Sequence, residues 1–281
     1  MAGMLRGCLR VGCAVRTGLA YSFHGGNSYA LRAFAPSSAA CDASKLPTSA
    51  SAADSPTGSK RFRQHVNPLT MAYRQPIELP DWAACFADAS LPIHLDIGCA
   101  RAKYLMDVAE KQTSQRNFVG VEIRRNVLDE AAREAARRGL RNLALVHANM
   151  NFQQTRLLQS LPARVASVSI LHPDPWMKKR HIKRRLVTDE FVAELARLLP
   201  NGTPVFVQTD VEELFDYMVE IFEASRLYDF EALQENPLGP PTDREKFVSD
   251  QGGDIFRIKF IVKKRAAEAA AQQLESPVQL E

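Results

Sequence analysis

The sequence is short of the residues that build a disulfide-bonded or metal-bound fold. Only five of its 281 residues are cysteines, and no two of them form a C-x-x-C pair. His65, His94 and His181 lack the spacing of metal ligands as well. We therefore expect neither a disulfide scaffold nor a bound metal.

Long apolar runs are also missing. No segment approaches the roughly 20 consecutive apolar residues of a transmembrane helix, so no membrane partner is expected. Hydrophobic residues nevertheless make up 46% of the chain and charged residues 24%, which is enough for a folded core. The net charge of +4 indicates no particular partner, so the local clustering of charge is more informative than the total.

Acidic residues are absent from the N-terminus until Asp42, whereas Arg, Ser and Ala are frequent there. This composition is typical of an organelle transit peptide, although a disordered tail without a targeting role is the alternative. We expect residues 1–60 to be a transit peptide and a disordered linker. Residues 61–264 should form one folded domain, and residues 265–281 a flexible helical tail.

Apolar runs typical of buried strands alternate with segments of helical periodicity. Strands are expected at 93–98, 117–123, 143–148, 164–172, 204–210 and 255–262. Helices are expected at 103–112, 126–139, 152–161, 188–199 and 212–225, with Thr188 as an N-cap. This alternation predicts an α/β fold with a doubly wound, mostly parallel sheet and an antiparallel edge strand.

Two acidic residues lie where the first two expected strands end. Asp96 precedes Gly98 in a loop that has Ala100 and Ala102 where further glycines are usual, and Glu122 ends the second strand. A carboxylate at that position can accept hydrogen bonds from ribose hydroxyls, which favours an adenosine-bearing cofactor. Asp96 would repel the pyrophosphate of NAD but suits the ammonium of S-adenosylmethionine, so the methyl donor is preferred.

The segment SILHPDPWMKKRHIKRR carries a carboxylate beside concentrated positive charge. Pro173 and Pro175 restrict the backbone on both sides of Asp174, and Trp176 follows. Trp176 could stack on a base or pack beneath the loop. Six basic residues come next: Lys178, Lys179, Arg180, Lys183, Arg184 and Arg185. A solvated face is the simplest interpretation, but the proximity to Asp174 favours a nucleic-acid phosphate backbone as partner.

The run PDPWMKKRHIKRR resembles the signature of the tRNA (guanine-N7)-methyltransferases of the bacterial and plastid type. DIGCAR, VGVEIRR, QTD and PPTDRE occur in the expected order around it, and the resemblance extends from Arg63 to Lys263. It implies a Rossmann-like class I methyltransferase domain that uses S-adenosylmethionine. The implied substrate is a guanine of tRNA, usually guanine 46 of the variable loop, with no metal and no obligate protein partner.

The resemblance also assigns site residues by position. Asp174 matches the catalytic residue. The cofactor-binding positions are Asp96, Gly98, Glu122, Arg124, His147, Ala148 and Asn149. The substrate-binding positions are Lys178, Asp210, Thr242, Arg244 and Glu245, the last three in a proline-flanked loop. Lys179, Arg180, Lys183, Arg184 and Arg185 are expected to contact the tRNA backbone.

Several positions depart from the family pattern and leave alternatives open. Ala102 replaces a usual glycine, Met177 stands where His is common, and His147 stands where Asp or Asn is usual, with Asn149 a candidate to contact the adenine instead. One rival is an RNA-binding protein that has kept the fold and lost the cofactor. A methyltransferase acting on a small molecule or a protein fits the basic run poorly. The match to plant and cyanobacterial relatives favours the plastid over the mitochondrion.

Overall fold

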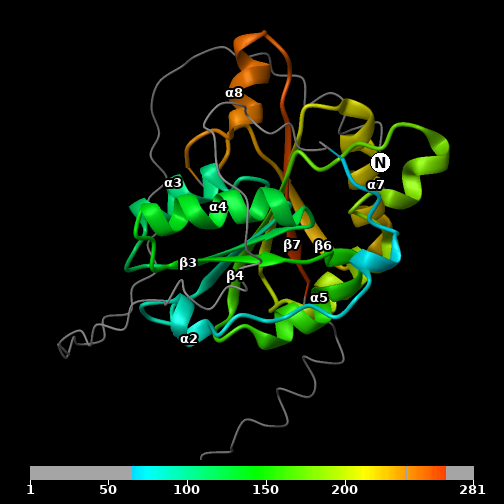
Figure 1. The fold of residues 1–281 in the computed structure, drawn as a ribbon. Helices are drawn as coiled ribbons and strands as arrows, with labels where there is room; N and C mark the ends of the chain where they lie inside the picture. The colour runs from blue at the N-terminus through cyan, green and yellow to red at the C-terminus, as the bar shows by residue number, and fades with distance from the viewer. Residues whose placement is uncertain (1–64, 238, 264–281) are drawn as a thin grey trace, which may run out of the picture. The chain divides into compact units, whose positions relative to one another are not determined.

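The computed structural model describes residues 65–237 and 239–263. A sheet lies at its centre (Figure 1). The strand order of this sheet is β3-β2-β1-β4-β5-β7-β6. The strands are β1 (Ile93–Ile97), β2 (Asn117–Glu122), β3 (Leu143–His147), β4 (Val165–Leu171), β5 (Pro204–Thr209), β6 (Tyr228–Ala232) and β7 (Phe256–Val262).

The sheet is parallel from β3 to β5, and its strand order reverses between β1 and β4. The predicted mostly parallel, doubly wound sheet is therefore confirmed. β7 pairs antiparallel with both β5 and β6, so the antiparallel strand lies one position inside the edge. β6 was not expected from the sequence, because its charged Asp229 and Glu231 are exposed and hide the strand pattern.

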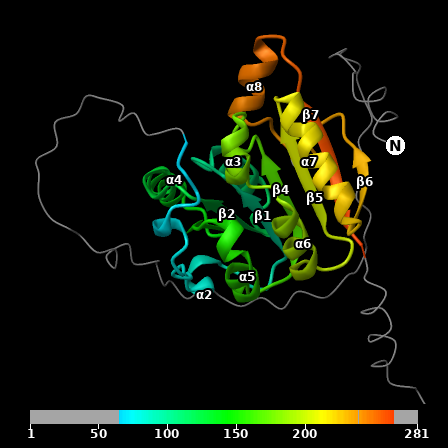
Figure 2. The same cartoon turned by 90° about the vertical axis from the view of Figure 1, so that its right-hand side faces the viewer.

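Helices cover both faces of the sheet (Figure 2). α3 (Lys103–Lys111) and α4 (Arg125–Arg137) lie on one face, and α5 (Met150–Ser160), α6 (Asp189–Leu198) and α7 (Glu212–Ser225) on the other. Because both faces are covered, every residue of β1 and β2 is buried. Thr188 caps α6 as predicted, accepting a hydrogen bond from the Phe191 amide.

Shorter helices connect these elements. They are η2 (Met71–Tyr73), α2 (Trp82–Cys85), η3 (Lys179–Arg184) and α8 (Asp243–Asp250). The loop predicted for residues 242–245 is wrong, because Thr242 and Glu245 form a capping box that starts α8. Arg244 and Glu245 therefore lie in the first turn of a helix, and only Thr242 precedes it.

The expected transit peptide, linker and C-terminal tail lie outside the described residues. None of the helices within 65–237 and 239–263 has the length and apolarity needed to cross a membrane.

Candidate active site

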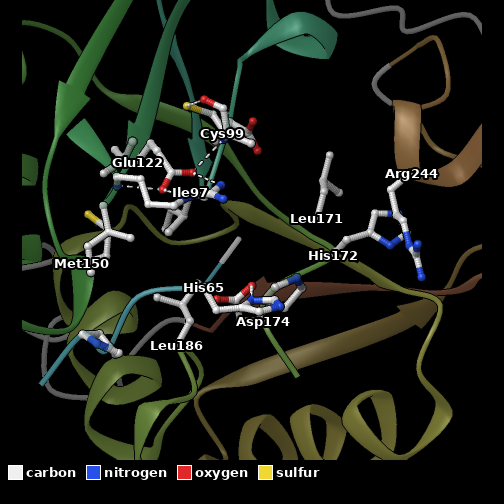
Figure 3. Close-up of a pocket in the computed structure, with 18 of the residues that line it drawn as sticks. His65, Ile97, Cys99, Glu122, Met150, Leu171, His172, Asp174, Leu186 and Arg244 are labelled. Carbon is white, nitrogen blue, oxygen red and sulfur yellow. Dashed lines mark hydrogen bonds and ion pairs between the residues drawn. The ribbon is translucent and has the colours of Figure 1, made fainter. Parts of the chain in front are cut away.

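A cavity of about 790 Å³ opens at the carboxyl ends of the parallel strands, where the strand order reverses (Figure 3). Ligands of doubly wound sheets bind at this edge. Most of the sequence-predicted site residues line this one cavity: Asp96, Gly98, Ala148, Asn149, Glu122, Arg124, Asp174, Arg184, Asp210, Thr242 and Arg244. His147, Lys178, Lys179, Arg180, Lys183, Arg185 and Glu245 do not line it.

The loop after β1 follows a left-handed path at alternate residues. Gly98 has φ +88°, and Ala100 and Ala102 both have φ +50°. Alanine adopts this region at some cost in free energy, whereas glycine adopts it freely. The two alanines thus preserve the backbone of a glycine-rich loop. A side chain at Gly98 would meet no atom within 4 Å, so the backbone there is open to a ligand.

The Glu122 carboxylate is fully engaged by neighbouring donors. Oε1 accepts from the backbone amide and Nε of Arg124, both at 2.9 Å. Oε2 accepts from the Ala100 amide and from Nη2 of Arg124, both at 3.0 Å. These four bonds use all the lone pairs of the carboxylate. Ribose hydroxyls can therefore reach Glu122 only after the Arg124 side chain turns aside.

Asp96 is a buried carboxylate that accepts one hydrogen bond from the part of the chain that the structure describes. The residue is 5% exposed, and the Ser169 hydroxyl donates to its Oδ1 over 2.6 Å. Burial raises the pKa of Asp96 to about 6, the Ser169 hydrogen bond opposes the rise, and nearby Glu122 adds to it. A bound cation would favour the ionised form.

The residues after β3 connect the cavity to the start of the described chain. Asn149 caps α5, and its side-chain amide donates to the Pro68 carbonyl over 2.8 Å. His147 instead contacts the Ile123 carbonyl through Nε2 at 2.9 Å. In this arrangement Asn149, and not His147, faces the cavity.

Asp174 lies on the turn after β4 and is half-exposed. His65 Nδ1 lies 2.7 Å from Asp174 Oδ1, and the exposed fractions of the two side chains are 46% and 42% (Figure 3). Sequence reasoning did not place His65 in the site, because it lies more than a hundred residues from Asp174. The available signal was its position in the segment RQHVNPL, residues 63–69, where the family resemblance begins. Trp176 stands beside both, with its ring centroid 5.8 Å from that of His65.

Asp210 is fixed at the end of β5 by two donors. Arg244 Nη2 donates to one carboxylate oxygen at 2.5 Å, and His172 Nδ1 lies 2.9 Å from the other. Burial would raise the pKa of Asp210, but these hydrogen bonds outweigh it and lower the pKa. Burial also lowers the pKa of His172, which favours a neutral imidazole that donates from Nδ1. His172, like His65, lines the cavity although it was not predicted as a site residue.

Glu245 differs from its predicted role as a substrate contact. It is 7% exposed, ion-paired with Arg257 at 2.6 Å, and part of the capping box with Thr242. Its carboxylate also accepts from Gln208 at 3.0 Å. Glu245 therefore stabilises the start of α8, the helix that carries Arg244, and does not face the cavity.

The basic run is divided by burial. Lys178, Lys179, Arg180 and Lys183 are exposed. Arg184 is half-buried, with its guanidinium 5.1 Å from the Trp176 ring centroid, so Trp176 also packs within its own loop.

Arg185 was predicted to contact the tRNA backbone, but the structure buries it. It is 3% exposed, donates to the Pro175 carbonyl over 2.8 Å and lies 4.3 Å from the Tyr217 ring centroid. The hydrogen bond from Arg185 to the Pro175 carbonyl stabilises the turn that carries Asp174. Because the Arg185 guanidinium is buried, it cannot reach a phosphate of the tRNA.

Comparisons with known proteins show the family of this chain. A family model described as a putative methyltransferase matches residues 90–258, so the chain belongs to the methyltransferases. The tRNA (guanine-N(7)-)-methyltransferase of Microcystis aeruginosa is 46% identical over 208 residues, 72% of this chain and 98% of that protein. The protein of the same name from Synechococcus elongatus is 44% identical and is covered over 96% of its length. The chain is a member of the tRNA (guanine-N7)-methyltransferase family.

Solved structures give further matches at low identity. The 16S rRNA methyltransferase KamB is 16% identical, with a TM-score of 0.44 over 64% of this chain and 95% of that chain. Within the part of the chain that the structure describes, no group of three or more His, Cys, Asp or Glu side chains could hold a metal ion.

Proposed function

We propose that this protein transfers a methyl group from S-adenosylmethionine to N7 of a guanine in tRNA, at guanine 46 of the variable loop. The observation that carries the proposal is the position of Asp174. Asp174 lines a cavity suited to the methyl donor, and the exposed basic residues Lys178, Lys179, Arg180 and Lys183 follow it closely in the sequence. The names of the relatives support tRNA and guanine N7 as the substrate and the position of methylation.

The cavity fits S-adenosylmethionine better than a phosphate-bearing cofactor. Arg101 and Lys103 beside the first loop are already paired with Glu130 and Asp243, at 3.1 and 2.8 Å. Buried Asp96 supplies negative charge where the methionine ammonium would bind. We assign cofactor binding to Asp96, Gly98, Glu122, Arg124, Ala148 and Asn149.

The chemistry makes modest demands on the protein. When bound, S-adenosylmethionine supplies a methyl group on a positively charged sulfur. Guanine N7 carries an in-plane lone pair and no proton, so no general base is needed to activate it. The site accelerates transfer mainly by orienting the base.

Asp174 is assigned both recognition and catalysis. Its carboxylate can accept hydrogen bonds from the N1–H and N2–H groups of guanine, which adenine lacks in that arrangement. It also stabilises the positive charge that the purine gains as N7 is methylated. In this assignment His65 leaves Asp174 Oδ1 when guanine binds, because both compete for the same oxygen.

Further residues are assigned to the tRNA. Asp210, Thr242 and Arg244 line the cavity and can contact the substrate near the target base. The exposed side chains of Lys178, Lys179, Arg180 and Lys183 are assigned to the phosphate backbone, in a contact that weakens with salt.

The direct test is methyl transfer by the full chain from labelled S-adenosylmethionine to an unmodified tRNA transcript. The RNA is then cleaved chemically at N7-methylguanosine. Cleavage after position 46, absent from a transcript with adenine 46, is expected. Labelling elsewhere would overturn the assigned position. Binding of tRNA without labelling and without cofactor binding would favour the RNA-binding protein that has lost its cofactor.

The proposed location is the plastid. Cyanobacterial relatives and the acid-poor first 41 residues support it. A fusion of residues 1–64 to a fluorescent protein should enter plastids. Import into mitochondria alone, or no import, would contradict this location.

A further inference from the structure

A continuous chain of hydrogen bonds runs through the buried sheet to Asp96. Arg116 Nη1 donates to the Ser167 hydroxyl at 3.1 Å, and that hydroxyl lies 2.8 Å from His94 Nδ1. His94 Nε2 lies 3.0 Å from the Ser169 hydroxyl, which donates to Asp96 over 2.6 Å. Parallel register between β1 and β4 aligns these side chains on one face of the sheet.

The direction of every bond in this chain follows from counting protons. Ser169 has one hydroxyl proton and gives it to ionised Asp96, so it must accept from His94 Nε2. His94 is 1% exposed, and burial with the nearby Arg116 charge lowers its pKa to about 3, so the ring is neutral. A neutral ring protonated at Nε2 accepts at Nδ1, and Ser167 is therefore the donor there. All four hydrogen bonds point toward the carboxylate.

The same chain reverses when Asp96 is protonated. The carboxylic acid can then donate to Ser169, Ser169 to His94 Nε2, and the ring carries its proton on Nδ1 instead. Bonds aligned toward an anion polarise and strengthen one another, so the first arrangement favours ionised Asp96. The tautomer of His94 thus reports the protonation state of a residue two hydrogen bonds away.

We infer that His94, acting through Ser169, is a positioning residue that holds Asp96 ionised and oriented toward the ammonium of the cofactor. This inference deepens the assignment of S-adenosylmethionine made above and rests on it. His94 does not line the cavity, so it would act on the cofactor only through Ser169 and Asp96.

Glu122 on β2, which is hydrogen-bonded to the Arg124 guanidinium, opposes ionisation of Asp96. Tyr104 on α3 and the Cys99 thiol also lie near the carboxylate, and burial raises the pKa of both, which favours their neutral forms. Phe118 contacts the His94 ring edge-on, and Arg164 lies near Arg116. Within the described residues, Ser169 is the only hydrogen-bond donor to the Asp96 carboxylate.

The first test uses the ligand-free protein and is independent of the cofactor. Nitrogen-15 NMR of the histidine rings should show His94 protonated at Nε2 at pH 8, and carbon-13 NMR should follow the titration of Asp96. In His94→Leu the Asp96 titration should move about one pH unit upward, the size expected for one lost hydrogen bond. An Nδ1-protonated ring at pH 8, or an unchanged titration in the variant, would overturn the inference.

The second test is calorimetric binding of S-adenosylmethionine at several pH values. The ratio of the Kd of His94→Leu to that of the wild type should rise from near unity at about pH 8.5 to roughly fivefold at about pH 6. His94→Gln, whose amide can accept from Ser167 and donate to Ser169, should restore the wild-type profile. A ratio independent of pH, or a failure of glutamine to rescue, would show a structural role only.

Val168→Ala is the matched control, because Val168 is fully buried on the opposite face of β4. It should lower stability without changing the pH dependence of binding. If the wild type itself binds no S-adenosylmethionine, the proposed cofactor is wrong, whereas the NMR titration still decides whether the chain controls Asp96.

Discussion

Two aspartates face one cavity from opposite environments. Asp96 lies one residue before the end of the central strand β1, is 5% exposed and has one hydrogen-bond donor among the described residues. The Asp174 side chain is 42% exposed on a proline-bracketed turn and is paired with His65. Burial makes a lone carboxylate dependent on an arriving cation, whereas exposure lets a carboxylate exchange partners with a large RNA. The difference indicates that one carboxylate serves the cofactor and the other the base.

The largest effect should follow from removing the charge of the exposed carboxylate, Asp174. Asp174→Asn should lower kcat for tRNA methylation by about 10²- to 10³-fold, because the amide cannot balance the positive charge on the purine. Single-turnover methylation with saturating tRNA measures it. Asp216→Asn removes an exposed carboxylate on α7 and should leave kcat unchanged. A loss below threefold in Asp174→Asn would mean that Asp174 is not catalytic.

The next largest effect concerns the tRNA backbone. The triple alanine variant of Lys179, Arg180 and Lys183 should weaken tRNA binding about 10- to 100-fold at low salt. It should also reduce the slope of log K against log salt by about 3, because each lost phosphate contact removes roughly one released counterion. Filter binding across a salt series measures both quantities.

The matched control for this variant removes three exposed basic residues remote from the turn. Lys111, Arg133 and Arg141 are suitable, since none of them lines the cavity. Their alanine variant should keep the wild-type salt slope. Equal losses in the two triple variants would indicate a general effect of net charge and no localised tRNA surface.

A smaller effect is expected when the buried carboxylate of Asp96 is replaced, and it should appear in the stability of the protein. The pKa of Asp96 is raised from its ordinary 3.8 to about 6, so ionised Asp96 destabilises the folded protein. The resulting decrease in the free energy of unfolding is absent below about pH 4, grows as the pH rises toward 6, and is constant at higher pH. Asp96→Asn should therefore increase the free energy of unfolding by about 2–3 kcal/mol above pH 6. Urea titrations between pH 4.5 and 8 measure the gain, and an equal gain at every pH would contradict it.

The smallest predicted effect is on protein stability and concerns the loop after β1. Ala100→Gly should stabilise the protein by up to about 1 kcal/mol, because glycine relieves the left-handed φ of +50°. Ala102 has the same φ but is 1% exposed, so glycine there also loses packing and should give no gain. Thermal unfolding measures the Tm of Ala100→Gly and of Ala102→Gly. Equal shifts in Tm for the two variants would contradict the predicted difference between these positions.

The sequence predicted the parts of the structure that depend on local pattern. Alternating apolar runs and helical segments indicated the sheet, and the acidic residues at strand ends indicated the cavity, because parallel strands end at one edge. β6 escaped detection because its exposed charges interrupt the strand pattern, and α8 because prolines and a glycine precede it.

Long-range partners could not be predicted in this way. His94 meets Ser167 and Ser169 only through the register of two strands more than seventy residues apart. The burial of Arg185 depends on Tyr217, contributed by another helix. Composition shows that such side chains exist, but only the folded chain shows which of them are hidden from solvent.

The most direct test of the account is calorimetric titration of S-adenosylmethionine into Asp96→Asn and Asp174→Asn at pH 7.5. We predict that Asp174→Asn keeps the wild-type Kd within about twofold, while Asp96→Asn weakens binding by at least roughly tenfold, as expected for one lost buried charge partner. Equal losses in the two variants, or wild-type binding in Asp96→Asn, would contradict the division of cofactor and base between the two carboxylates.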